Sequence, residues 1–182
     1  MQYKYEDNTK LRIAILLDKK TNKVVKQLNK QINQNINFDI DFEKKCLPHI
    51  TLVSGVLKKK KDFSNVCEII AQTIEEELHG KLNIDFEEFY FSQDNTWFFL
   101  KLKENEILKN FIEKLKENIK EYFEISQSRQ IHVTIAKSAE LTKKEKELKN
   151  LSLPTQFQAK EIGFGLSGDN GMLINAIKKF KI

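Results

Sequence analysis

The strongest constraint on the fold is an order of segments that occurs twice in the chain. The order begins with a short apolar segment suited to a strand, continues with a helical segment and a linker, and ends with a strand that opens with His-x-Thr. It spans approximately residues 11–55 and occurs again over approximately residues 97–138. Two similar units predict two halves that face each other across a pseudo-twofold axis. Because either half alone would bury little apolar surface, we expect both to pack into a single domain over residues 1–182.

The two motifs are His49-Ile50-Thr51 and His132-Val133-Thr134, which hold two of the chain's three histidines. In a strand, residues i and i+2 point to the same face, so each motif presents an imidazole beside a hydroxyl. Thr occupies 8 of 182 positions, so chance alone would place Thr two residues after both histidines roughly once in 500 cases. Two such strands facing each other predict a pocket with two imidazoles and two hydroxyls.

These four side chains suit phosphodiester chemistry. An imidazole titrates near neutral pH, so one histidine can accept a proton from water or a ribose hydroxyl while the other protonates the leaving oxygen. The threonine hydroxyls can donate hydrogen bonds to the non-bridging phosphoryl oxygens, where negative charge builds up in the transition state. No metal ion or other cofactor is required. The predicted catalytic residues are therefore His49, Thr51, His132 and Thr134.

Composition narrows the class of protein. The chain is 40% hydrophobic and 31% charged, which is typical of a globular protein, and no apolar run approaches the length of a membrane span. The polar stretch Met1 to Lys10 is unlike a secretory signal. Cys46 and Cys67 lack CxxC spacing, which favours a reducing compartment and small, buried or half-buried thiols. We expect an intracellular protein, cytoplasmic or nuclear, that does not bind membranes.

Paired H-x-T/S motifs about eighty residues apart resemble the 2H phosphoesterase superfamily, and the resemblance extends from Arg12 to Ile182. It implies a bilobal α+β fold in which two antiparallel sheets line a central cleft, with the motifs on its floor and helices outside. Members open 2′,3′-cyclic phosphates, cleave 2′-5′ linkages, trim RNA 3′ ends or join tRNA halves. The resemblance also gives the four motif residues their catalytic roles.

The leading hypothesis is thus a metal-independent phosphodiesterase, acting as a monomer on RNA ends or nucleotide 2′,3′-cyclic phosphates. One alternative is a non-catalytic module that binds a nucleotide or RNA end. Another is a 2′-5′ RNA ligase, which would use the same groups in reverse. In RNA-trimming members of the superfamily the first motif tends to supply the base, so the resemblance favours His49 as base and His132 as acid.

Further residues are candidates for substrate binding. Trp97, Tyr90 and Phe164 lie on expected strands and could stack on a base, although core packing is favoured for each. Arg129, in the loop before the second motif, could bind phosphate, although a solvated position is favoured. Lys137 has the opposite strand parity to the motif side chains, so we expect no direct role for it.

Hydrophobic periodicity and turn residues predict the remaining elements. Asp18, at the end of the first strand, has no expected partner, and Gly80 is the expected stop of a helix. The expected strands are 12–17, 49–55, 82–92, 96–103, 131–137, 156–167 and 172–182, and the expected helices are 24–32, 64–78, 107–122 and 142–149.

Overall fold

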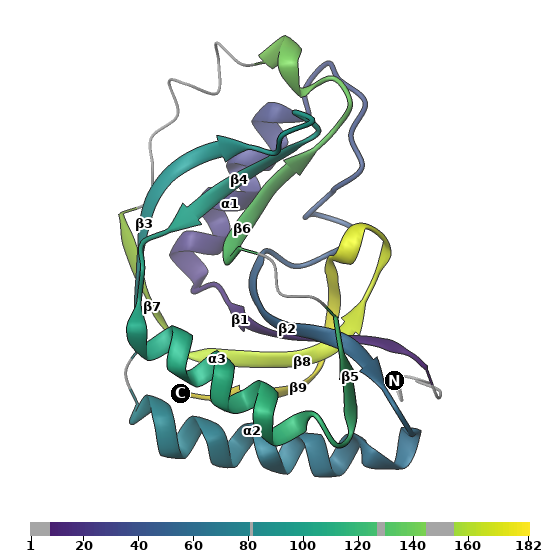
Figure 1. Cartoon of the computed structure of the whole chain (residues 1–182). Coiled ribbons are helices and arrows are strands. Elements are labelled where there is room, and N and C mark those ends of the chain that lie inside the picture. The colour runs from purple at the N-terminus through teal and green to yellow at the C-terminus, as the bar shows by residue number, and fades with distance from the viewer. Residues whose placement is uncertain (1–7, 81, 127–129, 145–154) are drawn as a thin grey trace.

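The computed structural model describes residues 8–80, 82–126, 130–144 and 155–182 (Figure 1). Its α-helices are α1 (Lys19–Ile32), α2 (Phe63–Leu78) and α3 (Glu106–Ile119). Its strands are β1 (Lys10–Leu16), β2 (His49–Leu57), β3 (Leu82–Phe91), β4 (Trp97–Leu102), β5 (Phe123–Ile125), β6 (His132–Lys137), β7 (Gln156–Ala159), β8 (Glu161–Ser167) and β9 (Leu173–Lys181). No helix in these ranges is both long and apolar enough to cross a membrane.

The strands form one antiparallel path in two groups. The order is β7-β3-β4-β6-β2-β1-β8-β9, and β5 pairs with β2 beside this path. The groups β7-β3-β4-β6 and β2-β1-β8-β9 meet where Ile50 of β2 pairs with Val133 of β6, so the two motif strands are neighbours. Figure 1 shows one group above the other, with the β2–β6 junction between them. The expected α+β fold, with antiparallel sheets around a central cleft, is confirmed.

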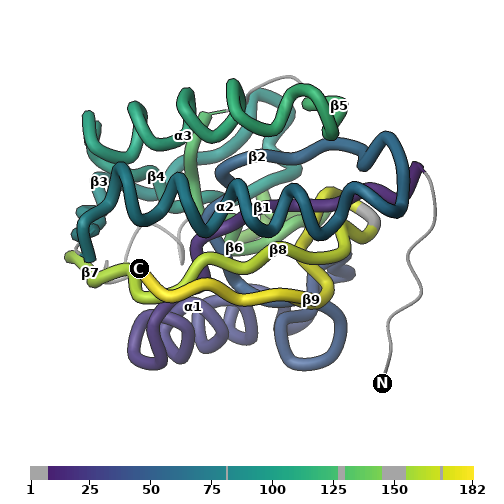
Figure 2. The backbone as a smooth tube through the Cα atoms, turned by 90° about the horizontal axis from the view of Figure 1, so that it is seen from below, coloured from purple at the N-terminus to yellow at the C-terminus, as the bar shows by residue number. Residues whose placement is uncertain are grey.

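The helices cover the outer faces of the two groups and interlock them. The helix that follows β1, α1, packs on β6, whereas the helix that follows β4, α3, packs on β2. Helix α2 lies beside α3, and Figure 2 shows α1 and α3 on opposite sides with strands between them. Helices α1 and α3 therefore each bury their apolar side on the other half of the molecule, as expected for a single packed unit.

Helix ends are fixed by local hydrogen bonds and backbone geometry. Asp18 is the N-cap of α1, because its Oδ1 accepts a hydrogen bond of 2.7 Å from the backbone N–H of Thr21. This is the partner that the sequence did not supply. Helix α2 ends where His79 and Gly80 both take positive φ, 43° and 78°, so the predicted stop at Gly80 is confirmed.

The C-terminal tail differs from the prediction. The segment expected as one strand, 156–167, breaks at Lys160 into β7 and β8. Strand β7 pairs with β3 and β8 pairs with β1, so the tail joins the two groups of strands. The short strand β5 was not predicted. Of the helix expected at 142–149, the described part is a 3₁₀ turn, Leu141–Lys144, and the rest lies outside the described residues.

Candidate active site

The two His-x-Thr motifs lie side by side on the floor of one cleft. Ile50 pairs with Val133, and in an antiparallel pair the flanking residues follow in opposite order. Each motif histidine therefore lies across from the threonine of the other motif, while the two middle residues are fully buried, as expected. The cleft has a volume of about 1310 Å³, and its lining includes all four predicted catalytic side chains: His49, Thr51, His132 and Thr134.

A bulge follows each motif at the same place. In β2 the register with β1 skips Leu52, and in β6 the register with β4 skips Ile135. An extra residue reverses strand parity beyond it, so Ser54 and Lys137 return to the cleft face. Lys137 accordingly pairs with Trp97, and the expectation from unbroken alternation that it faces away is wrong. The matched bulges support the predicted pseudo-twofold relation between the halves.

His49 is held as a neutral imidazole. The residue is 5% exposed, and its Nδ1 lies 2.7 Å from the carbonyl oxygen of Leu47. A carbonyl only accepts, so Nδ1 carries the hydrogen and Nε2 keeps its lone pair. Burial, followed by the positive charge of Arg12, lowers the pKa of His49 from 6.5 to about 3, and His132 adds a smaller effect in the same direction. The arrangement can therefore accept a proton at Nε2.

Arg12 of β1 contacts the first motif directly. Its Nη1 donates a hydrogen bond of 2.6 Å to Thr51 Oγ1 and lies 3.4 Å from Nε2 of His49. From the sequence, Arg12 was only the start of an expected strand. Its signal was a cation at the beginning of an apolar run, but only the pairing of β1 with β2 shows that it meets the motif.

His132 is positioned by aromatic side chains from β3 and β4. Its Nδ1 lies 3.4 Å from the hydroxyl of Tyr90, and its ring centroid lies 4.1 Å from that of Phe99. Burial raises the pKa of Tyr90, so this hydroxyl keeps its proton at neutral pH. From the sequence, Tyr90 was a candidate for stacking on a base, although core packing was favoured. The structure places it in the cleft lining with its hydroxyl toward the second motif.

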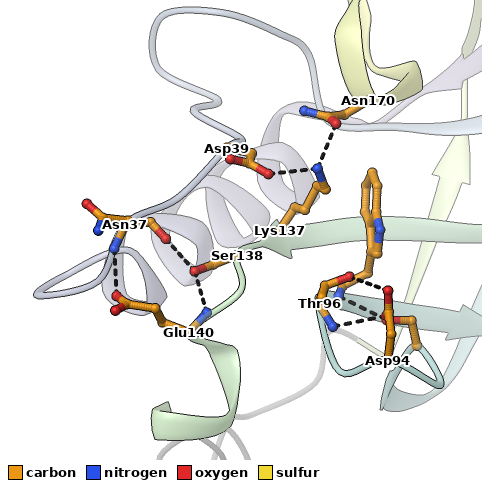
Figure 3. A network of polar contacts seen from close by, with 10 residues as sticks. Asn37, Asp39, Asp94, Thr96, Lys137, Ser138, Glu140 and Asn170 are labelled. Atoms are coloured by element: carbon orange, nitrogen blue, oxygen red, sulfur yellow. Dashed lines mark hydrogen bonds and ion pairs between the residues drawn. The ribbon is translucent and has the colours of Figure 1, made fainter.

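Trp97 and Phe99 form an aromatic wall beside the second motif. Their rings are stacked, with centroids 5.8 Å apart and an interplanar angle of 11°, and both line the cleft. The ammonium of Lys137 lies 5.2 Å from the Trp97 ring centroid. The same ammonium lies 2.7 Å from a carboxylate oxygen of Asp39 and 2.7 Å from the amide oxygen of Asn170. Both contacts can be followed in Figure 3. Lys137 thereby ties β6 to the β8–β9 turn at the rim of the cleft.

Two predicted substrate-binding residues are not part of the described site. Phe164 is fully buried on the outer face of β8, where it stacks on Phe63 at 4.9 Å and meets Phe123 edge-on. Core packing, which the sequence favoured for Phe164, is therefore confirmed, and the alternative role in stacking on a base is excluded for this ring. Arg129 lies outside the described residues.

The described part of the chain offers neither a reactive cysteine nor a cluster of metal ligands as an alternative to the histidine chemistry. Cys46 is buried and Cys67 half-buried, as expected, and burial raises the pKa of each thiol to about 11. A thiol with such a pKa is a poor nucleophile near neutrality. Over the same residues, no three His, Cys, Asp or Glu side chains are placed to hold a metal ion together.

Comparison with known proteins identifies the fold. No family model and no curated protein matches the sequence. E. coli LigT complexed with NADP⁺ has a TM-score of 0.67 at 10% identity, covering 97% of this chain and 98% of that one. TT0787 of Thermus thermophilus has a TM-score of 0.64 at 11% identity, covering 94% of this chain and 97% of that one. Kluyveromyces marxianus Usb1 with uridine monophosphate has a TM-score of 0.50 at 14% identity, covering 96% of this chain and 97% of that one. The chain therefore shares the fold of these proteins over nearly its whole length, as the resemblance in the sequence implied for the fold.

Proposed function

We propose that the protein is a metal-independent phosphodiesterase that acts on RNA ends or nucleotide 2′,3′-cyclic phosphates by two-histidine general acid–base catalysis. The observation that carries this proposal is the opposed pair of motifs, which brings two imidazoles and two hydroxyls to one cleft floor. Such a set supplies a proton acceptor, a proton donor and two donors for phosphoryl oxygens.

The opening of a 2′,3′-cyclic phosphate illustrates the roles. Water attacks phosphorus while Nε2 of His49 takes one of its protons. The bond from phosphorus to one ribose oxygen breaks, and a protonated His132 gives its proton to that oxygen. Thr51 and Thr134 donate hydrogen bonds to the non-bridging oxygens. The product is a phosphomonoester beside a free hydroxyl, and the two histidines recover their starting states by proton exchange with solvent.

The aromatic wall suggests how the nucleoside is held. Aromatic rings bind bases of any sequence by stacking, and Trp97 and Phe99 offer a stacked pair next to His132. Structures of proteins with the same fold contain nucleotides: 3′-AMP in LigT and uridine monophosphate in Usb1. We therefore assign substrate binding to Trp97 and to Tyr90, which packs against Phe99 of the same wall.

The test is an assay in EDTA on two substrates, a nucleoside 2′,3′-cyclic phosphate and a short oligoribonucleotide with a free 3′ hydroxyl. We expect turnover of at least one, and a loss of roughly 10²–10⁴-fold in His49→Ala and in His132→Ala. His79→Ala is the matched control, because His79 is exposed at the end of α2 and away from the cleft lining. Circular dichroism would establish that each variant is folded.

The outcomes separate the alternatives. Wild-type rates in both motif variants would rule out the proposed mechanism. Tight nucleotide binding without turnover, including on 2′-5′ linkages, would favour a binding module. Joining of RNA ends by the wild type, lost in the same variants, would favour a ligase.

A further inference from the structure

The motifs are alike, but the residues around them are not. In the register of β1 with β2, Ala14 pairs with Thr51, and Arg12 lies two residues earlier on the same face. In the register of β4 with β6, Phe99 pairs with Thr134, and Trp97 lies two residues earlier. The two halves thus place a guanidinium and an indole at equivalent positions, one beside each motif.

We propose that Arg12 is a positioning residue that makes the two halves of the site chemically unequal, directing the Thr51 hydroxyl to the phosphoryl group and keeping His49 as the proton acceptor. This role rests on the proposed function and deepens it. It assigns the direction of catalysis, with the base at His49 and the acid at His132, to one residue outside the motifs.

The contact with Thr51 fixes the direction of its hydroxyl. An arginine side chain has only donors, so the oxygen of Thr51 accepts the 2.6 Å hydrogen bond from Arg12. The single hydroxyl hydrogen of Thr51 is then available to another acceptor. Thr51 lines the cleft, where a phosphoryl oxygen would be that acceptor.

The contact with His49 keeps its ring in the accepting form. Nη1 of Arg12 lies 3.4 Å from Nε2, while Nδ1 is engaged with the backbone carbonyl of Leu47. Arginine stays protonated in proteins, so a proton on Nε2 would place two cations against each other. Among the described residues, the other titratable group that acts on this ring is His132, across the strand pair, and it opposes protonation as well.

The turn between β8 and β9 leaves room for this guanidinium. Gly171 takes a φ of 66°, and a Cβ built there would lie 2.8 Å from Nη2 of Arg12. A larger residue at this position would contact the guanidinium, so the β8–β9 turn forms one side of the space that Arg12 occupies. This packing, from β1, β2 and the β8–β9 turn, indicates a held side chain rather than a surface cation.

The test compares Arg12→Gln and Arg12→Lys with Lys10→Gln, a matched control two residues earlier in β1 that also removes one cation. Ring-nitrogen NMR of the free protein at a fixed pH near 5 measures the protonated fraction of His49. We expect a rise of about tenfold in Arg12→Gln, since a charge in contact shifts a pKa by about one unit or more. Arg12→Lys, which keeps the charge, and Lys10→Gln should match the wild type.

Kinetics on the cyclic phosphate provides the second readout. In Arg12→Gln the acidic limb of the kcat/KM profile should move to higher pH. Arg12→Lys should keep the limb in place but lower kcat about tenfold or more, because a lysine cannot hold both contacts at once. The proposal would be overturned if the protonated fraction of His49 were unchanged in Arg12→Gln, or if it rose by the same amount in Lys10→Gln. The NMR result decides this even for a protein that turns over neither substrate, so failure of the proposed function remains distinguishable.

Discussion

The buried His49 makes a quantitative prediction about stability that does not depend on any substrate. Its pKa is lowered from 6.5 to about 3 in the folded protein, mainly by burial and then by the charge of Arg12. In the unfolded chain the same imidazole returns to its ordinary value. Between these two values the unfolded state binds a proton that the folded state does not, so acidification favours unfolding.

The size of the effect follows from linkage. Stability from this group is fully present above pH 6.5 and is lost as the pH falls toward 3. A pH of 5 lies 1.5 units below the pKa of His49 in the unfolded chain, and each pH unit corresponds to about 1.4 kcal/mol. The titration of His49 therefore lowers the free energy of unfolding at pH 5 by about 2 kcal/mol relative to pH 7. Any folded pKa below 4 gives nearly the same figure at this pH.

The assay is urea unfolding of the wild type and of His49→Asn at pH 7 and pH 5. The asparagine amide can still donate to the carbonyl of Leu47, but it does not titrate. We expect the wild type to lose about 2 kcal/mol more than His49→Asn between the two pH values. His79→Asn, which leaves His49 in place, should fall as steeply as the wild type. Parallel behaviour of the wild type and His49→Asn would refute the neutral, buried assignment.

Substitutions at three further residues test other parts of the structure. Phe164→Ala should lower the free energy of unfolding by about 3–5 kcal/mol, measured with urea, because it empties a fully buried site beside Phe63. A small loss would contradict the burial of this ring. Asp18→Ala should cost about 1 kcal/mol by removing the cap on Thr21, and Asp18→Asn should keep most of it. Trp97→Ala should weaken binding of a nucleoside monophosphate, measured by calorimetry, by about 1–3 kcal/mol, and Trp97→Phe should weaken it less.

The sequence was sufficient for the motif strands because they combine a period-two pattern with residues whose chemistry is recognisable. The tail shows where periodicity stops being informative. The alternation is interrupted at Lys160 and Glu161, two successive charged residues, and there the chain changes its partner from β3 to β1. Nothing in a local pattern records which strand lies on the other side, so a strand prediction carries no information about such a switch.

The two bulges explain why the orientation of further side chains at the site could not be predicted from the sequence. Leu52 and Ile135 continue apolar runs, so they give no local sign that the strand parity reverses after them. Lys137 was consequently assigned to the wrong face. Arg12 was passed over for a related reason: its contacts with the first motif exist only because β1 pairs with β2 in one register. Both residues are set by pairing between distant segments, which a single sequence does not display.

The repeated geometry and the unrepeated neighbours have separate consequences for function. Opposed motifs and matched bulges place two equivalent imidazoles on one floor, and a symmetric environment would leave either one able to act as acid or base. The positions flanking them break this equivalence, with Arg12 on one side and Trp97 on the other. A cation favours the neutral form of the imidazole next to it and attracts the phosphoryl group, whereas an indole face attracts a base. The substrate would therefore bind in one orientation, with its phosphate toward His49 and its base beyond His132.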